Sequence, residues 1–393
     1  MTSPYFENGQ RHSQFFRQSD AIGSTSSPER EHKKIFVTAN HPAVRGGIRT
    51  AVLFNGQGSW FEKFGKAVYE NYSSAREAYD TVEAFMQKKR GISVQRLSFD
   101  NEVYDNSTGL ITKGALEKTR WQQVPTILYN YACMRAIYEE QEKAGGSVRP
   151  GFTGGYSLGV YSGFIESGAV ELIHGIDLVD GRAEKMEESV KDNPGGEVRI
   201  SMRTRDGEIS LAHRVFFEQA FNELKNLPGI YVAAIHSDVE IMLAARDQDI
   251  STIMSFIEKF KERHAKIPEV GQLRATLLPK DQVPGPFHSK LVEGAMLGIG
   301  AALENIHVKK ATIPIASNLT GRLISTVSEI VHEMEHSIPN SILLKDNIDA
   351  LLKAGVIYIV QPGELRRTIS MLPRFVEVKN ETGEVMGREE YTT

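Results

Sequence analysis

The sequence lacks most of what a secreted or membrane-spanning protein would need. Cys133 is its only cysteine, so no internal disulfide can form and a disulfide-stapled secreted scaffold is excluded. No stretch of about 18 apolar residues is present to span a bilayer. The first residues, MTSPYFENGQRHSQFF, do not have the basic-then-apolar pattern of a signal peptide. We therefore expect a cytoplasmic protein that has no membrane partner.

An excess of positive charge is also missing. The chain carries 46 Lys and Arg against 50 Asp and Glu, a formal net charge of -4, so no overall positive field can hold a nucleic-acid backbone. Nucleic acid is not expected as a partner. Hydrophobic residues make up 40% of the 393 residues and charged residues 24%, which is typical of a globular protein. This length allows two domains, or one large domain with an insertion.

The apolar pattern divides the chain into regions. Residues 1–48 are rich in serine and charge and predict an N-terminal extension. Residues 49–195 and 283–393 contain strand–turn–helix units, which indicate an α/β fold with buried strands. Two strand–helix units in residues 196–282 predict a small α+β insertion. Near the end, a hairpin is predicted around Asn380–Gly383.

The strongest local signal is the GxSxG pattern Gly155-Tyr156-Ser157-Leu158-Gly159, which stands between a short strand and a helix. Its glycines permit a sharp turn that lifts the serine oxygen clear of the backbone. The following helix would direct its N-terminal amides toward an oxyanion. Ser157 is therefore the candidate nucleophile. Taken alone, the pentapeptide fits a Gly-rich turn equally well.

A serine nucleophile needs a base, and the chain has eleven histidines. We select His288, because the loop Pro284-Gly285-Pro286-Phe287-His288-Ser289 holds it on rigid backbone just before an apolar helix. A loop histidine considered by itself is more commonly a surface residue. The assignment therefore depends on the other motifs.

A zinc-binding pattern, HExxH, is present at His332-Glu333-Met334-Glu335-His336. We reject it as a metal site. Short patterns recur by chance, the segment has the spacing of a charged, solvent-facing helix, and no later motif supplies a clear third ligand. No metal ion is expected.

Five segments resemble, in the same order, landmarks of the malonyl-CoA:acyl carrier protein transacylase family, which also occurs as acyltransferase domains of polyketide synthases. The match spans roughly residues 49–370. The segments are the loop Phe54-Asn55-Gly56-Gln57-Gly58-Ser59, similar to F-P-G-Q-G-S, the elbow GYSLG, similar to G-H-S-L-G, PFHS around His288, Ser317-Asn318-Leu319-Thr320-Gly321, and Gln361-Pro362-Gly363.

The resemblance implies a fold and a reaction. The fold would be a large α/β-hydrolase-like subdomain with a parallel sheet, residues 49–195 and 283–393, plus an inserted small ferredoxin-like α+β subdomain, residues 196–282. The reaction would move a malonyl group from malonyl-CoA to the phosphopantetheine thiol of an acyl carrier protein through a malonyl-serine intermediate. Such transfer serves fatty-acid or polyketide biosynthesis. No cofactor is implied, since the coenzyme A thioester is itself the substrate.

Residue roles follow from the same resemblance. Ser157 and His288 would be the catalytic pair, and the backbone N–H groups of Gln57 and Leu158 would form the oxyanion hole. In the family a main-chain carbonyl orients the histidine, so no acidic partner is implied. Arg182, in LVDGR with Met186 behind it, resembles the arginine that holds the malonyl carboxylate, a task that suits its planar, two-pronged guanidinium.

The implied substrate pocket contains Phe287, His236 and Gln123. Phe287 resembles the residue of malonyl-selecting relatives, where a bulky ring would crowd an α-methyl branch. Rejecting one methyl group is worth about 1–3 kcal/mol, so we expect a preference for malonyl over methylmalonyl and not an exclusion.

Four positions depart from the family pattern. Tyr156 replaces a histidine before the nucleophile, and Val160 replaces an acidic or amide residue after the elbow. His236 stands where asparagine is usual. The histidine-orienting stretch Q-x-x-S-P-V-R-W is barely visible in HSIPNSILLKDN, where spacing puts the glutamine position near Ser337.

Two other functions remain open at this point. A serine hydrolase, such as an esterase or thioesterase, would need an acidic residue between Ser157 and His288, and Asp238 and Asp247 lie in that interval. A non-catalytic carrier-binding module would be consistent with the altered histidine-orienting stretch. Arg182 and the GQGS loop favour the transacylase, because a hydrolase needs neither.

Overall fold

The computed structural model describes residues 49–104, 109–146, 149–202, 209–356, 358–363, 378–379 and 385–386. All of these described residues belong to one compact unit. The predicted extension, residues 1–48, lies outside the described residues.

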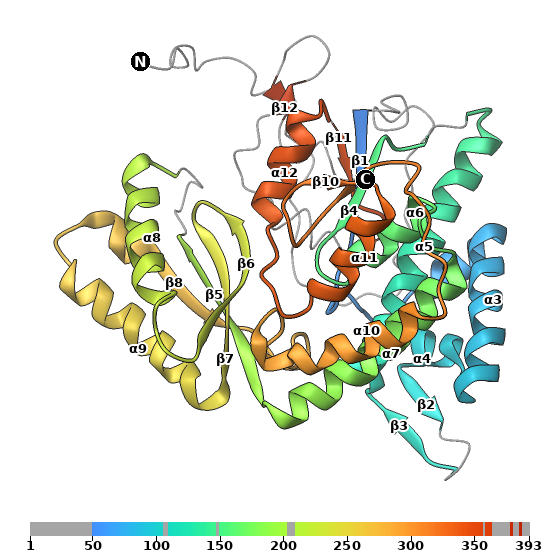
Figure 1. Ribbon diagram of the computed structural model, residues 1–393, viewed down its shortest axis with the longest axis horizontal. Helices are drawn as coiled ribbons and strands as arrows, with labels where there is room; N and C mark the ends of the chain where they lie inside the picture. Colours follow the sequence, from blue (N-terminus) through green and yellow to red (C-terminus); the bar gives the residue numbers. More distant parts are fainter. Residues whose placement is uncertain are drawn as a thin grey trace, which may run out of the picture. The chain divides into compact units, whose positions relative to one another are not determined.

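A five-stranded sheet in the order β10-β9-β4-β1-β11 confirms the predicted α/β class with a parallel sheet (Figure 1). Strand β1 (Thr50–Phe54) pairs in parallel with β4 (Phe152–Gly155) and β11 (Tyr358–Val360), and β4 pairs in parallel with β9 (Ile315–Ala316). Strand β10 (Leu323–Ile324) is antiparallel to β9. All five residues of β1 are buried, as expected for a parallel strand covered on both faces.

The parallel strands bring four of the family-like segments to one edge of this sheet. Residues 55–59 follow β1, residues 156–158 follow β4, residues 317–321 follow β9, and residues 361–363 follow β11. The carboxyl ends of parallel strands meet at the same edge, where open α/β sheets place their sites. Loops far apart in sequence are thereby collected in one place.

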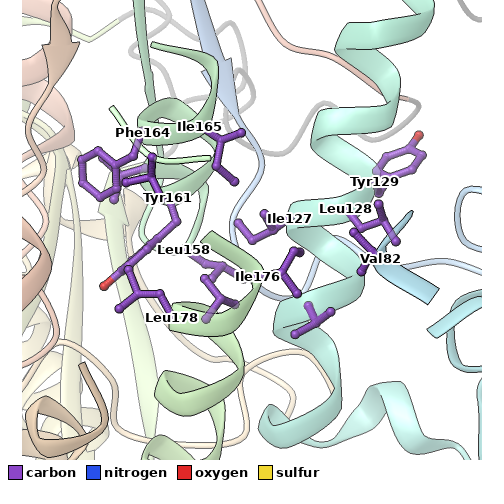
Figure 2. Close-up of a cluster of buried hydrophobic side chains, with 14 of the residues drawn as sticks. Val82, Ile127, Leu128, Tyr129, Leu158, Tyr161, Phe164, Ile165, Ile176 and Leu178 are labelled. Atoms are coloured by element: carbon purple, nitrogen blue, oxygen red, sulfur yellow. The ribbon is translucent and has the colours of Figure 1, made fainter. Parts of the chain in front are cut away.

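Helices pack around this sheet and form the main core. Helix α5 is buried along most of its length, polar side chains such as Gln123 and Asn130 included, because other elements enclose it. Figure 2 shows side chains of α5, α6 and α7 in this core. The helices are α2 (Lys66–Asn71), α3 (Ser73–Arg90), α4 (Val94–Asp100), α5 (Thr119–Lys143), α6 (Gly159–Glu166), α7 (Leu172–Asp192), α10 (Met296–Leu303), α11 (Val327–His336) and α12 (Leu344–Lys353).

A second, antiparallel sheet in the order β6-β7-β5-β8 is formed by the segment for which the sequence predicts an α+β insertion. Helices α8 and α9 cover one face of it and share its core (Figure 1). On the other face, Ala233 and Met242 pack with Leu53 and Ile342 of the larger part. The elements are β5 (Gly195–Met202), α8 (Leu211–Leu224), β6 (Ile230–Ser237), β7 (Glu240–Arg246), α9 (Asp247–Arg263) and β8 (Leu273–Leu277).

Two short strand pairs complete the described elements. Strands β2 (Glu102–Tyr104) and β3 (Ile111–Lys113) pair antiparallel. Strands β12 (Val378–Lys379) and β13 (Val385–Met386) also pair antiparallel, on either side of the turn predicted at residues 380–383. Among the helices that are described, none combines the length and apolar character required to cross a membrane.

The buried position of α5 gives a stability prediction. Leu128→Ala removes a fully buried side chain from the main core and should lower the free energy of unfolding by about 2–5 kcal/mol. Leu297→Ala, in which the same change is made at a side chain that is 74% exposed, should change it by less than about 0.5 kcal/mol. Chemical denaturation of both variants checks this, and equal effects would contradict the assignment of α5 to the core.

Candidate active site

Ser157 lies on a tight turn between β4 and α6. Its φ of +52° is in the left-handed region, which is strained for a side-chain-bearing residue. The flanking glycines make the turn possible. A Cβ on Gly155 would come within 2.2 Å of the Gly159 carbonyl carbon, and a Cβ on Gly159 would come within 2.3 Å of the Phe54 carbonyl oxygen. The two glycines of the motif are thus required by close backbone approach.

His288 faces this turn from a loop that precedes the 3-10 helix Lys290–Ala295. Its Nε2 lies 2.6 Å from Ser157 Oγ. Its Nδ1 lies 3.1 Å from the Ser337 carbonyl oxygen and 3.2 Å from the Asn340 carbonyl oxygen. Carbonyl oxygens only accept hydrogen bonds, so Nδ1 carries the proton and Nε2 is free to accept the serine proton.

The histidine-orienting carbonyl is therefore present although its sequence signature is weak. Ser337 is the C-terminal cap of α11 and supplies a main-chain oxygen, which does not depend on the side chain. The second carbonyl, of Asn340, was not anticipated by sequence analysis. A backbone acceptor has no residue-type signal, so only the conformation of the loop can reveal it.

Burial is the main reason why the pKa of His288 is lowered to about 4. The side chain lies in a water-poor setting that disfavours its charged form, and the positive charge of Arg182 lowers the pKa further. The hydrogen bonds to Ser337 and Asn340 act in the opposite direction. At neutral pH the imidazole is thus uncharged, which is the form that a general base requires.

The resemblance implies that the backbone N–H groups of Gln57 and Leu158 stabilise negative charge near Ser157. Leu158 caps the first turn of α6, and the loop that carries Gln57 touches the elbow, since a Cβ on Gly56 would lie 2.4 Å from the Tyr156 carbonyl oxygen. In the described part of the chain, no hydrogen-bond acceptor faces the N–H of either Gln57 or Leu158. These are the donors expected for an oxyanion hole.

Arg182 is buried in α7, with 1% of its surface exposed. Its Nη1 donates a hydrogen bond to Gln123 Oε1, and its guanidinium lies 5.3 Å from the centroid of the Tyr161 ring. Within the described residues it has no ion pair with a carboxylate, and its Nε has no hydrogen-bond partner. A buried cation without a counter-charge is costly, so the arrangement suits an anionic ligand.

Glutamine side chains connect Arg182 to the oxyanion loop. Gln123 Nε2 donates to Gln57 Oε1 at 3.2 Å, and Gln57 Nε2 donates to Thr119 Oγ1 at 3.3 Å. Gln123 Nε2 also lies 3.3 Å from Met186 Sδ. The structure thus brings Gln123 beside Arg182, as the expected pocket requires.

Asp180, two residues before Arg182, provides a contrast. Its buried carboxylate pairs with Lys89 at 2.7 Å, Arg90 at 2.8 Å and Arg120 at 2.7 Å. Burial is the largest single influence on the pKa of Asp180 and raises it. The neighbouring cations together outweigh burial, so that the pKa is lowered. This ion cluster connects α3, α5 and α7, and Arg182 is not one of its members.

The remaining pocket candidates differ in their surroundings. His236 lies against the elbow, with Nε2 2.9 Å from the Tyr156 hydroxyl and Nδ1 3.0 Å from Glu240 Oε1. Phe287 precedes His288 and its side chain is buried in the main core.

The two carboxylates that a hydrolase triad would use are engaged elsewhere. Asp238 pairs with Arg214 at 3.1 Å and Lys345 at 3.5 Å. Asp247 pairs with Lys280 at 2.7 Å. Because two carbonyl oxygens already face His288 Nδ1, neither Asp238 nor Asp247 orients the imidazole.

The HExxH segment forms the C-terminal half of α11, but its first glutamate, Glu333, is not solvent-facing as the sequence spacing suggested. Glu333 is buried and accepts hydrogen bonds from Ser317 Oγ at 2.5 Å and from the Leu319 N–H at 3.2 Å. It is drawn inward because the 317–321 loop offers it donors. The residues that the structure describes contain no group of three His, Cys, Asp or Glu arranged to hold a metal ion.

The fold is similar to that of malonyl-transacylases of known structure. The crystal structure of MCAT from Streptococcus pneumoniae matches with a TM-score of 0.63 at 21% identity, over 82% of this chain and 91% of that chain. A type II PKS acyl-carrier protein in complex with its malonyl-transacylase matches with a TM-score of 0.65 at 18% identity, over 84% of this chain and 94% of that chain.

Among curated proteins, the malonyl CoA-acyl carrier protein transacylase of Bacillus subtilis is 25% identical over 317 residues, 80% of this chain and 86% of that protein. No protein-family model matches the chain. The resemblance predicted from the motifs is thus confirmed by the fold and by a curated relative aligned over most of both lengths.

The lowered pKa of His288 gives a pH prediction for the reactivity of Ser157. Labelling of Ser157 by a fluorophosphonate, measured by intact mass, should proceed at a constant rate from pH 8 down to about pH 5 and fall only as the pH drops through about 4. The labelling rate falls at low pH because protonated His288 cannot accept the serine proton. A midpoint near 6.5, the ordinary histidine value, would contradict the buried setting. Ser157→Ala should not be labelled.

Proposed function

We propose that this protein transfers a malonyl group from malonyl-CoA to the phosphopantetheine thiol of an acyl carrier protein, through a malonyl ester of Ser157. One observation carries the proposal. Arg182 is a buried cation without a carboxylate partner among the described residues, and it is close enough to the Ser157–His288 pair to lower the pKa of His288. The names of the relatives support the same substrate and carrier.

Loading begins with proton transfer from Ser157 Oγ to His288 Nε2, across the 2.6 Å hydrogen bond, as Oγ attacks the thioester carbonyl carbon. The carbonyl oxygen becomes negative and accepts hydrogen bonds from the N–H groups of Gln57 and Leu158. The carbon–sulfur bond then breaks, and His288 returns the proton to the departing sulfur. Coenzyme A leaves as the free thiol, and Ser157 holds the malonyl ester.

Transfer to the carrier reverses these roles. The phosphopantetheine thiol gives its proton to His288 and its sulfur attacks the ester carbon, producing a second oxyanion in the same hole. The bond to Ser157 Oγ breaks, and Oγ takes the proton back from His288. One histidine therefore serves both half-reactions, and no cofactor is needed.

The malonyl carboxylate would bind to Arg182. Gln123 holds one guanidinium nitrogen, which fixes the plane of the group before the ligand arrives. The unpartnered Nε leaves donors for a carboxylate that is held by two charge-assisted hydrogen bonds. The bulk of Phe287 is consistent with a preference for malonyl over branched acyl groups.

Within this proposal the two sheets are two subdomains. The parallel sheet and its helices, residues 49–195 and 283–393, form an α/β-hydrolase-like part. Residues 196–282 form a ferredoxin-like part, supported by the element order β5-α8-β6-β7-α9-β8 and the antiparallel strand order β6-β7-β5-β8.

Covalent malonylation is the decisive test of this function. On mixing with malonyl-CoA, the protein should gain one malonyl unit in its intact mass, and Ser157→Ala should gain none. His288→Ala should load about 10²–10⁴-fold more slowly. Ser98→Ala removes a buried hydroxyl that has no hydrogen-bond partner among the described residues, and it should load like the wild type. A wild-type protein that never gains this mass would refute the proposal.

Arg182 should decide which acyl group is accepted. Arg182→Ala should lose malonyl loading and gain relative activity toward acetyl-CoA, because an acetyl group leaves the buried guanidinium unpaired at a cost of more than about 1–3 kcal/mol. Arg182→Lys should recover malonyl use only in part, since a point charge does not reproduce the two-pronged geometry.

The measurement is the ratio of malonyl to acetyl loading rates for these variants. Arg263→Ala, which removes an exposed arginine of α9, is the matched control and should keep the wild-type ratio. An unchanged ratio in Arg182→Ala would place Arg182 outside the substrate site.

A further inference from the structure

Next to the nucleophile, three polar side chains form a hydrogen-bonded chain. Glu240 Oε1 lies 3.0 Å from His236 Nδ1, and His236 Nε2 lies 2.9 Å from the Tyr156 hydroxyl. A carboxylate accepts hydrogen bonds, so Nδ1 carries the proton of His236 and Nε2 accepts the hydroxyl proton of Tyr156. The Tyr156 and His236 rings also meet edge to face, with centroids 5.3 Å apart.

The backbone of β6 is bent to allow this contact. The pairing of β6 with β7 shifts register between Ile235 and Ser237, so that His236 is the extra residue of a β-bulge. His236 at this bulge is buried, with 2% of its surface exposed. A bulge re-aims a side chain, and here it turns His236 toward the elbow.

Tyr156 touches both loops of the expected oxyanion hole. It directly precedes Ser157 and Leu158 in the chain. It also lies against Gly56, since a Cβ there would be 3.3 Å from Tyr156 Cδ1 and 2.4 Å from the Tyr156 carbonyl oxygen. Holding Tyr156 in place therefore fixes the spacing between the N–H of Gln57 on one loop and the N–H of Leu158 on the other.

Strand β6 is itself fastened to the segment that orients His288. The Ile342 N–H donates to the Ala233 carbonyl at 2.9 Å, and the Ile235 N–H donates to the Ile342 carbonyl at 2.8 Å. Two residues earlier, the Asn340 carbonyl faces His288 Nδ1. His236 is thus held on a strand whose position is tied to the catalytic base.

We propose that Glu240, His236 and Tyr156 act as a positioning relay that holds the two oxyanion-stabilising N–H groups at their working distance. This inference rests on the proposed function, from which it takes the reaction at Ser157. It adds a role for three residues to which the proposed function gives none. Both ring nitrogens of His236 are engaged within the relay, and none of its three side chains contacts a reacting atom. Its loss should therefore weaken transition-state stabilisation and leave substrate binding unchanged.

Single-turnover malonylation of Ser157 tests this with Tyr156→Phe, which keeps the ring and removes only the hydroxyl. The maximal loading rate should fall about 10- to 100-fold, while the malonyl-CoA concentration at half-maximal rate stays the same. Tyr79→Phe is the matched control, since it removes a buried tyrosine hydroxyl for which the described part of the chain supplies no hydrogen-bond partner, and it should load at the wild-type rate.

Two variants of His236 test the hydrogen bonds themselves. His236→Leu should slow loading as Tyr156→Phe does, and the double variant should be no slower than the slower single variant, because both changes break the same chain. His236→Gln should recover part of the rate, since an amide offers an acceptor to Tyr156 and a donor to Glu240.

Fluorophosphonate labelling of Ser157 needs no malonyl group and should slow in the same variants. It therefore tests the positioning relay separately from the proposed malonyl transfer. If Tyr156→Phe loads and labels at wild-type rates, the relay has no positioning role and the inference is wrong, while the proposed function stands. A raised half-saturating concentration at an unchanged maximal rate would make Tyr156 a substrate contact and also overturn it. If the wild type is labelled but never malonylated, the proposed function fails, and the labelling rates alone decide on the relay.

Discussion

The site depends on the hydrogen bond between Ser157 Oγ and His288 Nε2, which joins segments 131 residues apart. Both residues have a left-handed backbone, with φ of +52° each, and such strain costs about 1–3 kcal/mol per residue. The surrounding structure must offset it. At Ser157, the pairing of β1 with β4 and the close glycine contacts of the elbow hold the backbone. At His288, the carbonyls of Ser337 and Asn340 hold the imidazole in one orientation.

The smaller sheet contributes to the site through β6 and through Glu240, the first residue of β7. Strand β6 meets the elbow through His236 and meets the histidine-orienting segment through its pairing with Ile342. A shift of this sheet would therefore move the nucleophile side and the base side of the site relative to each other. Since reacting groups misplaced by about 1 Å can cost a hundredfold in rate, the packing of Ala233 and Met242 against the larger part has a direct bearing on catalysis.

Sequence reasoning reached the parts of the site that leave a residue-type signal. The glycines around Ser157 and the Pro/Gly-rich loop at His288 are required by backbone geometry. Their residue types therefore predict the nucleophile turn and the position of the base. Three features could not be read in this way. The carbonyl of Asn340 belongs to a backbone that any residue provides, the bulge at His236 depends on strand register, and the burial of Glu333 depends on donors in a loop that is brought near only by the fold.

Under the proposed function, the buried charge of Arg182 would link substrate choice to the strength of the base. In the free protein it adds to the effect of burial and holds the pKa of His288 near 4, which keeps the imidazole uncharged but makes it a weak proton acceptor. A carboxylate bound to Arg182 would cancel this positive charge and raise the pKa of His288 toward the operating pH. An acetyl group would bring no such change. The same carboxylate that orients the malonyl group would thus also strengthen the base, so the discrimination between acyl groups would appear in the rate of loading as well as in binding.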